Sequence, residues 1–429
     1  MNIFALSTNP GKSSISIIRL SGPNAFYIAN KFLDKEPEIR KATRKKIIYN
    51  NDLIDIGVVI FYPFNHSYTG EQLVEFNLHG SNAVIKKMLE ILCKQKNSRI
   101  AYPGEFTQRA FENNKLDLSQ VEGIYNLIEA ETESQRKLSL KILEGSLGIK
   151  VKKWKTQLIN ILSLLEASID FSEEELPKDI LKEIQNNIYK IKLDFQKELK
   201  GSKVADSINN FFEVAIVGKP NVGKSTLLNY LSQKNTSIVT NVPGTTRDII
   251  EVKLDIKGLP VVFLDTAGLH KSNDKVEKIG IKRTLERLSK VDLRIFLINN
   301  NKELKTFEKL IKNHDLVFFA KNDLKNKRNK GISGKTGEGT DLLFDQVFNL
   351  FSKKTSSVGS VVNNRHRLII KNSLFFIDDA LSKCNSSFDK VEMIAEDIRH
   401  TINELNFLTG KVGVEDILSN IFSKFCIGK

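Results

Sequence analysis

The sequence predicts three kinds of fold in one chain: an α+β domain, an all-α domain, and an α/β domain inserted within the all-α domain. Short apolar runs separated by turn residues fill the first part of the chain. Further on, apolar residues recur every three or four positions, as in amphipathic helices. Between these helical parts, strand-like apolar runs alternate with helical stretches. We therefore expect an α+β domain at 1–117, a helical domain in two parts at 118–208 and 356–429, and an inserted α/β domain at 209–355.

The first domain is predicted from three strand-like runs and one helix. ISIIRL (15–20), IDIGVVIFY (54–62) and LVEFNL (73–78) are rich in β-branched and aromatic residues. AVIKKMLEILCKQ (83–95) has helical spacing. This mixture predicts an α+β unit.

Long amphipathic helices are predicted from Leu118 onward. Leu118, Val121 and Ile128 begin a pattern with three- to four-residue spacing that continues to Ile169. The charged stretch 172–203 keeps apolar residues at the same spacing, so we expect one more helix there. After about residue 355 the helical spacing returns and strand-like runs stop.

The inserted domain is predicted from four buried strands at 211–218, 261–265, 293–299 and 316–320. Each is followed by a polar or glycine-rich turn and a helical stretch. Strands and helices that alternate in this way predict a parallel sheet with crossover helices.

The charge of the chain favours an acidic partner. Its 429 residues include 65 Lys and Arg against 51 Asp and Glu, a formal net charge of +14. Nucleic acid is the usual partner of such a chain. The alternative is a Lys- and Asn-rich composition that only keeps the surface soluble, and charge alone does not separate the two.

The three cysteines predict neither disulfides nor zinc. Cys93, Cys384 and Cys426 lie far apart and form no CxxC pair, which favours a reducing compartment and a cytoplasmic protein. Cys93 and Cys384 fall in predicted helices, where we expect them in the core.

The first residues do not resemble a signal peptide, and no run of about 18 apolar residues predicts a membrane span.

A phosphate-binding loop is predicted at GKPNVGKS (218–225), which fits the pattern G-x-x-x-x-G-K-[ST] between a strand and a helix. Gly218 and Gly223 let the backbone N–H groups face phosphate oxygens. Lys224 would bring a positive charge to the β- and γ-phosphates, and Ser225 would offer its hydroxyl to Mg²⁺.

Four further motifs follow in the order expected for a guanine-nucleotide site. GTTRD (244–248) would supply Thr246 to Mg²⁺, and DTAG (265–268) would supply Asp265 to Mg²⁺ through water. Asp323 of AKND (320–323) would accept two N–H bonds from guanine, which adenine cannot offer, and SGK (333–335) would support the base. The predicted GTP-binding residues are Asn221, Val222, Gly223, Lys224, Ser225, Thr226, Thr240, Asn241, Val242, Pro243, Gly244, Thr245, Thr246, Asp265, Thr266, Ala267, Gly268, Lys321, Asp323, Ser333, Gly334 and Lys335.

Two positions depart from the usual pattern of such sites. Ala320 stands where NKxD has Asn, which removes an amide that ties the base loop to the phosphate loop. Losing one or two neutral hydrogen bonds costs about 1–3 kcal/mol, so we expect weaker nucleotide binding with retained selectivity. Leu269 stands where Ras-like enzymes place a Gln that orients water, so hydrolysis needs another group.

Nearly the whole chain resembles the MnmE (TrmE) family of bacterial tRNA-modification GTPases. The resemblance is carried by IIRLSGP (17–23), SYTGEQLVEFNLHG (67–80), PGEFTQRAFENNKLDLSQVE (103–122), DTAGLHKSNDKVEKIG (265–280) and IFSKFCIGK (421–429). It implies an N-terminal tetrahydrofolate-binding and dimerisation domain, and a helical domain that carries an inserted Ras-like GTPase domain.

The resemblance also implies K⁺ in place of an arginine finger. The matching K⁺ positions are Asn221, Thr240, Val242 and Thr245. A cation between the phosphates would offset the charge that develops on bond cleavage. Two GTPase domains are expected to dimerise across their switch loops, and Glu277 matches the family's acidic residue that acts on the attacking water.

For the N-terminal domain, the resemblance implies a bound tetrahydrofolate derivative in a 5,10-methylene or formyl form. The matching ligand residues are Arg19, Glu75, Lys115 and the terminal Lys429. Cys426 of the FCIGK motif would face the folate, in a chemical role that the sequence leaves open.

The reaction implied is the installation of an aminomethyl or carboxymethylaminomethyl group at carbon 5 of the wobble uridine of certain tRNAs. The implied partners are a second copy of the chain, the FAD protein MnmG in a heterotetramer, and tRNA. Ammonium or glycine would supply the nitrogen, and the sequence does not decide between them.

Two alternatives remain at this point. A ribosome-assembly GTPase of the Era or Der type also lacks the catalytic Gln, but such proteins carry a KH-like module or tandem GTPase domains. A folate-binding regulator with a vestigial GTPase is the second alternative, and Ala320 gives it slight support.

Overall fold

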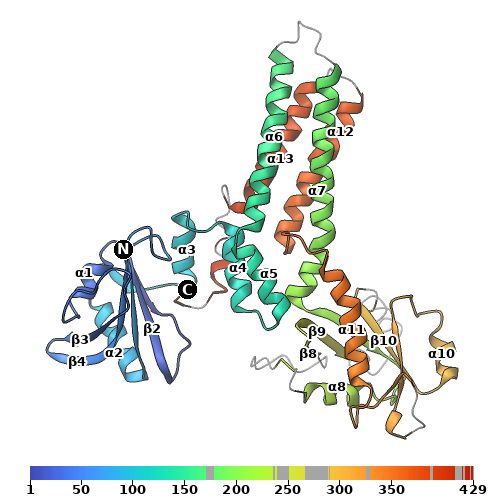
Figure 1. The fold of residues 1–429 in the computed structure, drawn as a ribbon, viewed down its shortest axis with the longest axis horizontal. Coiled ribbons are helices and arrows are strands. Elements are labelled where there is room, and N and C mark those ends of the chain that lie inside the picture. Colours follow the sequence, from blue (N-terminus) through green and yellow to red (C-terminus); the bar gives the residue numbers. More distant parts are fainter. Residues whose placement is uncertain are drawn as a thin grey trace, which may run out of the picture. The chain divides into compact units, whose positions relative to one another are not determined.

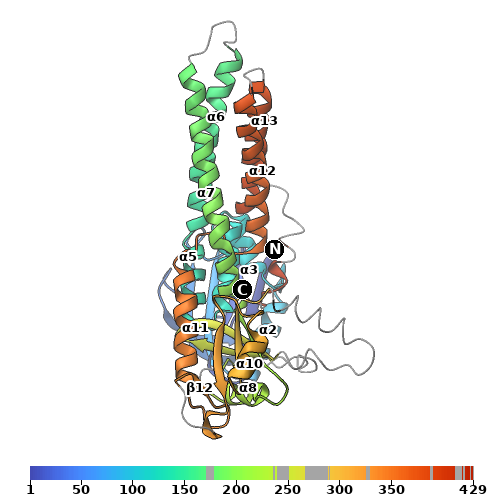
Figure 2. The same ribbon diagram turned by 90° about the vertical axis from the view of Figure 1, so that its right-hand side faces the viewer.

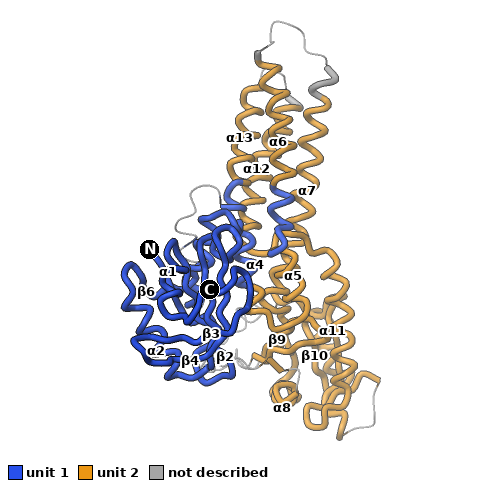
Figure 3. The backbone as a smooth tube through the Cα atoms, turned by 60° about the vertical axis from the view of Figure 1, so that its left-hand side comes forward, with its two compact units in different colours: residues 1–125, 143–151, 406–429 blue, residues 126–142, 152–405 orange. Residues whose placement is uncertain are grey.

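The computed structural model (Figure 1) describes most of the chain. The described residues are 1–170, 178–234, 237–238, 251–265, 288, 290–324, 329–386, 390–410, 418, 421–425 and 427–428. Contacts divide the chain into two compact units, shown in Figure 3. Unit 1 comprises Met1–Tyr125, Leu143–Val151 and Asn406–Lys429, and unit 2 comprises Asn126–Ile142 and Lys152–Leu405.

Unit 1 is built on a six-stranded sheet with the strand order β3-β4-β5-β2-β1-β6. Its pairs are antiparallel except for β1 with β6. The strands are β1 (Asn2–Leu6), β2 (Ser13–Ser21), β3 (Thr43–Tyr49), β4 (Asp52–Tyr62), β5 (Leu73–Gly80) and β6 (Ser98–Ile100), and the helices are α1 (Ala25–Asn30), α2 (Asn82–Cys93), α3 (Glu105–Glu112) and α4 (Leu118–Ile128).

One face of this sheet packs against α1 and α2. Because side chains alternate along a strand, every second residue points into this core. The core includes Ile18, Phe61 and Phe76 from the strands, together with Ile28 and Met88 from the two helices. The α+β prediction is therefore confirmed for this part of the chain.

Unit 2 contains a second six-stranded sheet with the order β12-β11-β10-β7-β9-β8. The strands are β7 (Phe212–Val217), β8 (Glu251–Ile256), β9 (Leu259–Asp265), β10 (Leu293–Ile298), β11 (Leu316–Ala320) and β12 (Gly331–Ile332). The connecting elements are α8 (Lys224–Ser232), α10 (Asn301–Phe307), the 3₁₀ turn Asn322–Leu324 and α11 (Thr340–Thr355).

This sheet is mixed rather than purely parallel. The four predicted strands β7, β9, β10 and β11 are parallel, as expected. β8 pairs antiparallel with β9 through a tight turn, which the sequence prediction omitted. The turn needs left-handed backbone at Lys257 and Gly258, with φ of +51° and +86°.

The helical part of unit 2 is a bundle. In Figures 1 and 2, α6 (Ser146–Asp170), α7 (Lys178–Asn210), α12 (Asn364–Ser386) and α13 (Val391–Thr409) run side by side. Trp154 of α6 meets Phe195 of α7 edge-on, with ring centroids 5.0 Å apart. Lys383 of α12 pairs with Asp397 of α13 at 2.6 Å. The helix predicted within 172–203 is confirmed from Lys178 onward, and residues 171–177 lie outside the described residues.

Among the described residues, no helix offers a stretch both long and apolar enough to cross a bilayer.

Cys384 is half-buried, and burial raises the pKa of its thiol. Cys93 is exposed, so its predicted place in the core is wrong: it is the last residue of α2, whose buried stripe ends at Leu92. Cys426 lies outside the described residues.

The core of the second sheet extends into the helical segments. Leu138 and Ile142 of α5 (Glu133–Leu143) and Ile208 of α7 belong to the same buried cluster as Leu254 and Phe263 of the sheet. The turn between β8 and β9 also contacts α5, because the backbone N–H of Ser134 donates to the carbonyl of Gly258 at 3.0 Å. The sheet and these helix segments should therefore unfold together.

We expect Leu138→Ala to lower the free energy of unfolding by about 2–5 kcal/mol, because it removes a buried side chain and leaves a cavity. The measurement is the urea unfolding transition of unit 2, followed by the release of a bound fluorescent GDP analogue. Leu193→Ala is the matched control, since Leu193 on α7 is 47% exposed and its truncation should cost within about 0.5 kcal/mol. Equal shifts for both variants would contradict the shared core.

Candidate nucleotide and one-carbon sites

The carboxyl ends of the parallel strands meet at one edge of the second sheet. β7 lies between β9 and β10, so the connection after β7 and the connection after β9 lead to opposite sides of β7. Ligands of open α/β sheets bind at such a switch point. The predicted motifs follow β7, β9, β11 and β12, and their described residues therefore gather at this edge.

The phosphate loop joins β7 to α8. Asn221 and Gly223 both adopt left-handed backbone, with φ of +59° and +112°, and Gly223 is the N-cap of α8. This curl turns the first N–H groups of α8 outward, where they favour an anion. Asn221 is exposed at the corner of the loop.

Lys224 lies across its own loop. Its Nζ donates to the carbonyl of Gly218 at 2.8 Å and to that of Lys219 at 3.0 Å. Burial lowers the pKa of Lys224, and the nearby Asp265 carboxylate acts against this shift. A buried cation held within a loop of N–H groups suits a polyphosphate.

Ser225 and Asp265 come together although they are 40 positions apart. The Ser225 hydroxyl donates to Asp265 Oδ2 at 2.8 Å, and Asp265 ends β9 with 2% of its surface exposed. A hydroxyl beside a carboxylate is an oxygen pair that fits Mg²⁺. The third predicted participant, Thr246, lies outside the described residues.

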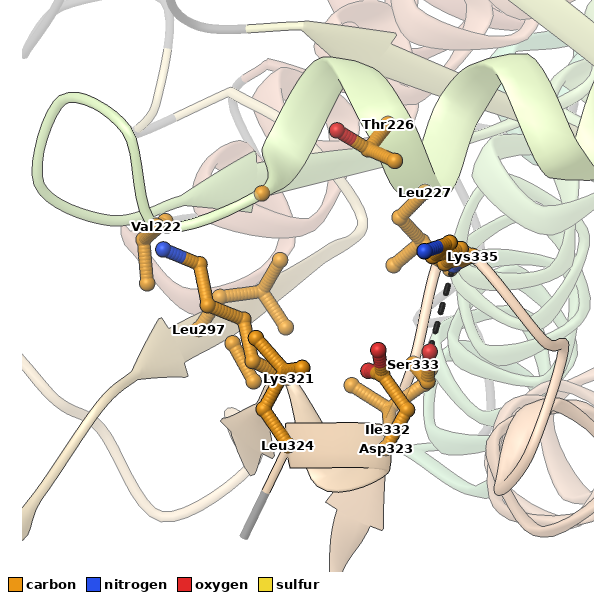
Figure 4. Close-up of a pocket in the computed structure, with 13 residues that line it drawn as sticks. Val222, Thr226, Leu227, Leu297, Lys321, Asp323, Leu324, Ile332, Ser333 and Lys335 are labelled. Atoms are coloured by element: carbon orange, nitrogen blue, oxygen red, sulfur yellow. Dashed lines mark hydrogen bonds between the residues drawn. The ribbon is translucent and has the colours of Figure 1, made fainter.

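The base loops form a pocket of about 180 Å³ against α8. In Figure 4, the carboxylate of Asp323 and the side chain of Ser333 lie at one end, and Lys321 extends toward Val222. The residues that line it are Val222, Gly223, Thr226, Leu227, Leu297, Ala320, Lys321, Asp323, Leu324, Ile332, Ser333, Gly334 and Lys335.

Close backbone packing holds the second base loop. A Cβ on Gly334 would lie 2.5 Å from the backbone nitrogen of Leu227 in α8, so this position requires glycine. The Ser333 hydroxyl accepts the N–H groups of Lys335 and Thr336, each at 3.2 Å. The loop therefore presents Gly334 and Lys335 to the pocket in a fixed form.

The structure brings together the described part of the predicted GTP site. The remaining predicted residues lie outside the described residues, among them the catalytic Glu277. They are Thr240, Asn241, Val242, Pro243, Gly244, Thr245, Thr246, Thr266, Ala267, Gly268 and Glu277. Sequence reasoning missed the apolar wall of Leu297, Leu324 and Ile332, which only the pairing of β10, β11 and β12 brings together.

A second group of predicted residues meets in unit 1. Arg19 on β2 and Glu75 on β5 are direct cross-strand neighbours, and Arg19 Nε lies 2.8 Å from Glu75 Oε1. The hydroxyl of Tyr62 donates to Glu75 Oε2 at 3.4 Å. Burial, and then the Glu75 charge, raise the pKa of Tyr62.

The C-terminal tail reaches this pair. Arg19 Nη1 donates to the carbonyl of Gly428 at 3.4 Å, and the Ser7 hydroxyl donates to the same carbonyl at 3.0 Å. Lys429 itself lies outside the described residues. Lys115 donates to the carbonyl of Asn65 at 2.6 Å, so it is anchored to the loop before β5 rather than bonded to Arg19 or Glu75.

Sequence reasoning missed Tyr62 and Tyr68 beside this pair. The Tyr68 ring lies 5.8 Å from the Arg19 guanidinium, and its hydroxyl is 2.8 Å from that of Thr107 in α3. Burial raises the pKa of Tyr68. The sequence signal for Tyr62 was the strand-like run 54–62 that it ends. The sequence signal for Tyr68 was the SYTGE segment that contains it.

The phosphate loop, the Ser225–Asp265 pair and the base pocket with Asp323 define a P-loop domain of the GTPase class. The family model "GTP-binding protein TrmE N-terminus" matches residues 2–115, and "MnmE helical domain" matches residues 118–426. The chain belongs to the MnmE (TrmE) family.

Full-length relatives agree with the family assignment. Proteins named tRNA modification GTPase MnmE from Roseobacter denitrificans and Jannaschia sp. are each 42% identical over 428 residues, covering 100% of this chain and 99% of their own. These matches exclude the Era or Der alternative as the family of this chain.

Solved structures give only weak overall similarity. Aquifex aeolicus Era bound to GDP·AlF₄⁻ is 25% identical with a TM-score of 0.24, over 32% of this chain and 56% of its own. The G domain of T. maritima FeoB is 23% identical with a TM-score of 0.26, over 32% of this chain and 97% of its own. Scores this low add nothing to the assignment.

We expect Ala320→Asn to tighten GDP binding. Ala320 is 5% exposed and lines the pocket, so an amide there could bond to the phosphate loop. One neutral hydrogen bond is worth about 0.5–1.5 kcal/mol, which predicts an affinity gain of roughly 2- to 12-fold in a titration with a fluorescent GDP analogue. Ala320→Val is the control without an amide. Unchanged affinity for Ala320→Asn would show that another contact already replaces the missing bond.

Proposed function

We propose that this protein is a K⁺-dependent GTPase that, with MnmG, installs the (carboxymethyl)aminomethyl group at carbon 5 of the wobble uridine of certain tRNAs. The observation that carries the GTP half is the meeting of Lys224, Ser225, Asp265 and Asp323 at one sheet edge. The names of the full-length relatives support tRNA as the substrate. Because tRNA is the substrate, we assign the reaction to the cytoplasm.

Guanine selectivity rests on Asp323 in this proposal. Its carboxylate points into the base pocket and can accept both N–H groups on one edge of guanine (Figure 4). Adenine offers no such pair of donors there. Lys321, whose side chain extends along the pocket, would cover the other side of the base.

Cations supply the charge stabilisation that hydrolysis needs. Mg²⁺ and K⁺, when bound, offset charge on the phosphates. Ser225 and Asp265 would hold Mg²⁺ with Thr246, and the exposed Asn221 would hold K⁺ with Thr240, Val242 and Thr245. Glu277 would orient the attacking water in place of the Gln that Leu269 replaces. Two GTPase domains would dimerise across these loops during turnover.

The one-carbon half rests on the Arg19–Glu75 pair. This ion pair is only partly exposed, at 23% and 16% of the two side chains, and carries a donor and an acceptor side by side. A tetrahydrofolate derivative offers the complementary set, N–H groups for Glu75 and an oxygen for Arg19. Lys115, Lys429 and Cys426 would complete the site within a homodimer that binds MnmG as a heterotetramer.

The domain limits that accompany this proposal are 1–117 for the folate-binding domain and 209–355 for the GTPase domain. The helical domain takes the two remaining parts, 118–208 and 356–429. GTP hydrolysis would then reorganise the complex through the helical domain, and no phosphoryl group would pass to tRNA.

We expect GTP turnover by the purified protein to be at least about tenfold faster in KCl than in NaCl, a gain of ~1.4 kcal/mol in transition-state stabilisation. Asn221→Ala should abolish the K⁺ stimulation, and Glu277→Ala should lower turnover in both salts. Lys219→Ala is the matched control in the same loop, since its side chain is exposed and, among the described residues, pairs with Glu303 at 3.8 Å.

Equal turnover in the two salts would remove the K⁺ mechanism. Turnover that is also negligible in KCl would favour the alternative of a folate-binding regulator with a vestigial GTPase. A wild-type rate in Glu277→Ala would remove that residue from the mechanism.

A further inference from the structure

The six-stranded sheet of unit 1 has a second face, opposite the core of α1 and α2. On β4 and β2 this face carries Val58 and Ile15, which are 36% and 60% exposed. On β3 it carries Arg44 and Lys46, both exposed, while Lys45 and Ile47 between and after them are buried. Solvent therefore reaches this face along β3, β4 and β2.

Strand register places the Arg19–Glu75 pair on this same face of the sheet. Arg44 is opposite Val58, and Val58 is opposite Asn77. Two residues along, Ile60 is opposite Glu75, which pairs with Arg19. Arg44 and Arg19 thus point from the same face, three strand spacings (~4.8 Å each) and two residues along the strand apart, about 16 Å in all.

The β3 edge is cationic and lacks countercharges. Arg40, Arg44 and Lys46, here called the basic rim, pair with no carboxylate in the described part of the chain. Some other cations of unit 1 do have carboxylate partners: Arg99 pairs with Glu105 at 2.6 Å, and Lys41 pairs with Glu38 at 2.9 Å.

The basic rim continues toward the Arg19–Glu75 pair through Arg40. The backbone N–H of Arg40 donates to the carbonyl of Phe61 at 2.8 Å, and its φ is +60°, a conformation that a non-glycine residue rarely adopts. Its charge also acts on the phenol of Tyr62, which bonds to Glu75. A line of unpaired positive charge therefore runs from the edge strand toward Arg19 and Glu75.

Protection of the sheet edge explains only part of this arrangement. A single lysine is enough to discourage edge-to-edge pairing, because it disfavours a second apolar strand. It does not require two unpaired cations on the face that carries the Arg19–Glu75 pair, with Arg40 next to them. A second copy that placed its own basic rim against this one would be repelled.

We propose that the basic rim binds the phosphate backbone of the tRNA substrate and so presents the target base to the Arg19–Glu75 pair. This inference rests on the proposed function, since it takes tRNA as the substrate. Arg44 and Lys46 are two residues apart on one strand, about 6.7 Å, and can each contact a phosphate of one RNA strand. The exposed Val58 and the half-buried Ile60 and Asn77 lie between the rim and the pair, where a base can pack against them.

The test compares two charge-reversed double variants of the full-length protein. R44E/K46E reverses two charges of the basic rim, and K86E/K94E reverses two exposed, unpaired lysines on or next to α2, on the other side of the sheet. Binding of fluorescently labelled tRNA is measured by anisotropy between 50 and about 300 mM KCl, where each phosphate contact contributes about 0.7–0.9 to the salt slope.

R44E/K46E should weaken tRNA binding at least tenfold and, by removing two phosphate contacts, reduce the salt slope by about 1.4–1.8. K86E/K94E should stay within about threefold of the wild-type affinity, and both variants should keep wild-type GTP turnover and folate binding.

Wild-type affinity in R44E/K46E, or equal losses in the two double variants, would overturn the proposal. So would a change in oligomeric mass of R44E/K46E by light scattering with tRNA affinity retained, which would assign the face to a protein contact. If the wild-type protein binds no folate, the one-carbon half of the proposed function fails. The anisotropy curves would still test whether the basic rim binds tRNA.

Discussion

Close backbone packing at the carboxyl edge of the second sheet is the constraint on which the nucleotide site depends. Gly334 lies against the backbone of Leu227, so the loop after β12 and the first turn of α8 are in van der Waals contact. Because the phosphate loop leads directly into α8, this one contact fixes the distance between the base pocket and the phosphate loop. Lys224 and the Ser225–Asp265 pair then close the site from the other side. A side chain at position 334 would separate two parts of the site that must bind one nucleotide.

The sheet and the helices α5 and α7 share a core, which gives the GTPase fold a mechanical connection to the rest of unit 2. The turn between β8 and β9 bonds to Ser134, and β9 ends at Asp265. Movement of β9 with the state of the nucleotide would therefore be transmitted to α5. Residues 126–142 belong to unit 2, whereas the chain on both sides of them belongs to unit 1, so α5 is covalently tied to the unit that carries Arg19 and Glu75.

The sequence predicted β2, β4, β5, β7, β9, β10 and β11, and missed β1, β3, β6, β8 and β12. β11 is a continuous apolar run, and β7, β9 and β10 each carry only one charged residue, so their pattern was sufficient. β6 and β12 have three and two residues, too few for any periodicity, and β3 interleaves charges with its apolar residues because it is an edge strand. For the sites, the phosphate loop could be read from its spacing alone. The Arg19–Glu75 pair could not, since 56 positions separate the two residues and only strand register joins them.

The central claim is that one chain joins GTP hydrolysis in unit 2 to one-carbon chemistry in unit 1. The most direct measurement is mass spectrometry of wobble uridines in tRNA from cells that lack this gene and carry wild-type, Lys224→Ala or Glu75→Gln copies. The account predicts that the wild-type copy restores the C5 modification and that neither variant does, although both accumulate to wild-type levels. Restoration of the modification by Lys224→Ala would contradict the account, because the chemistry would then proceed without the nucleotide site.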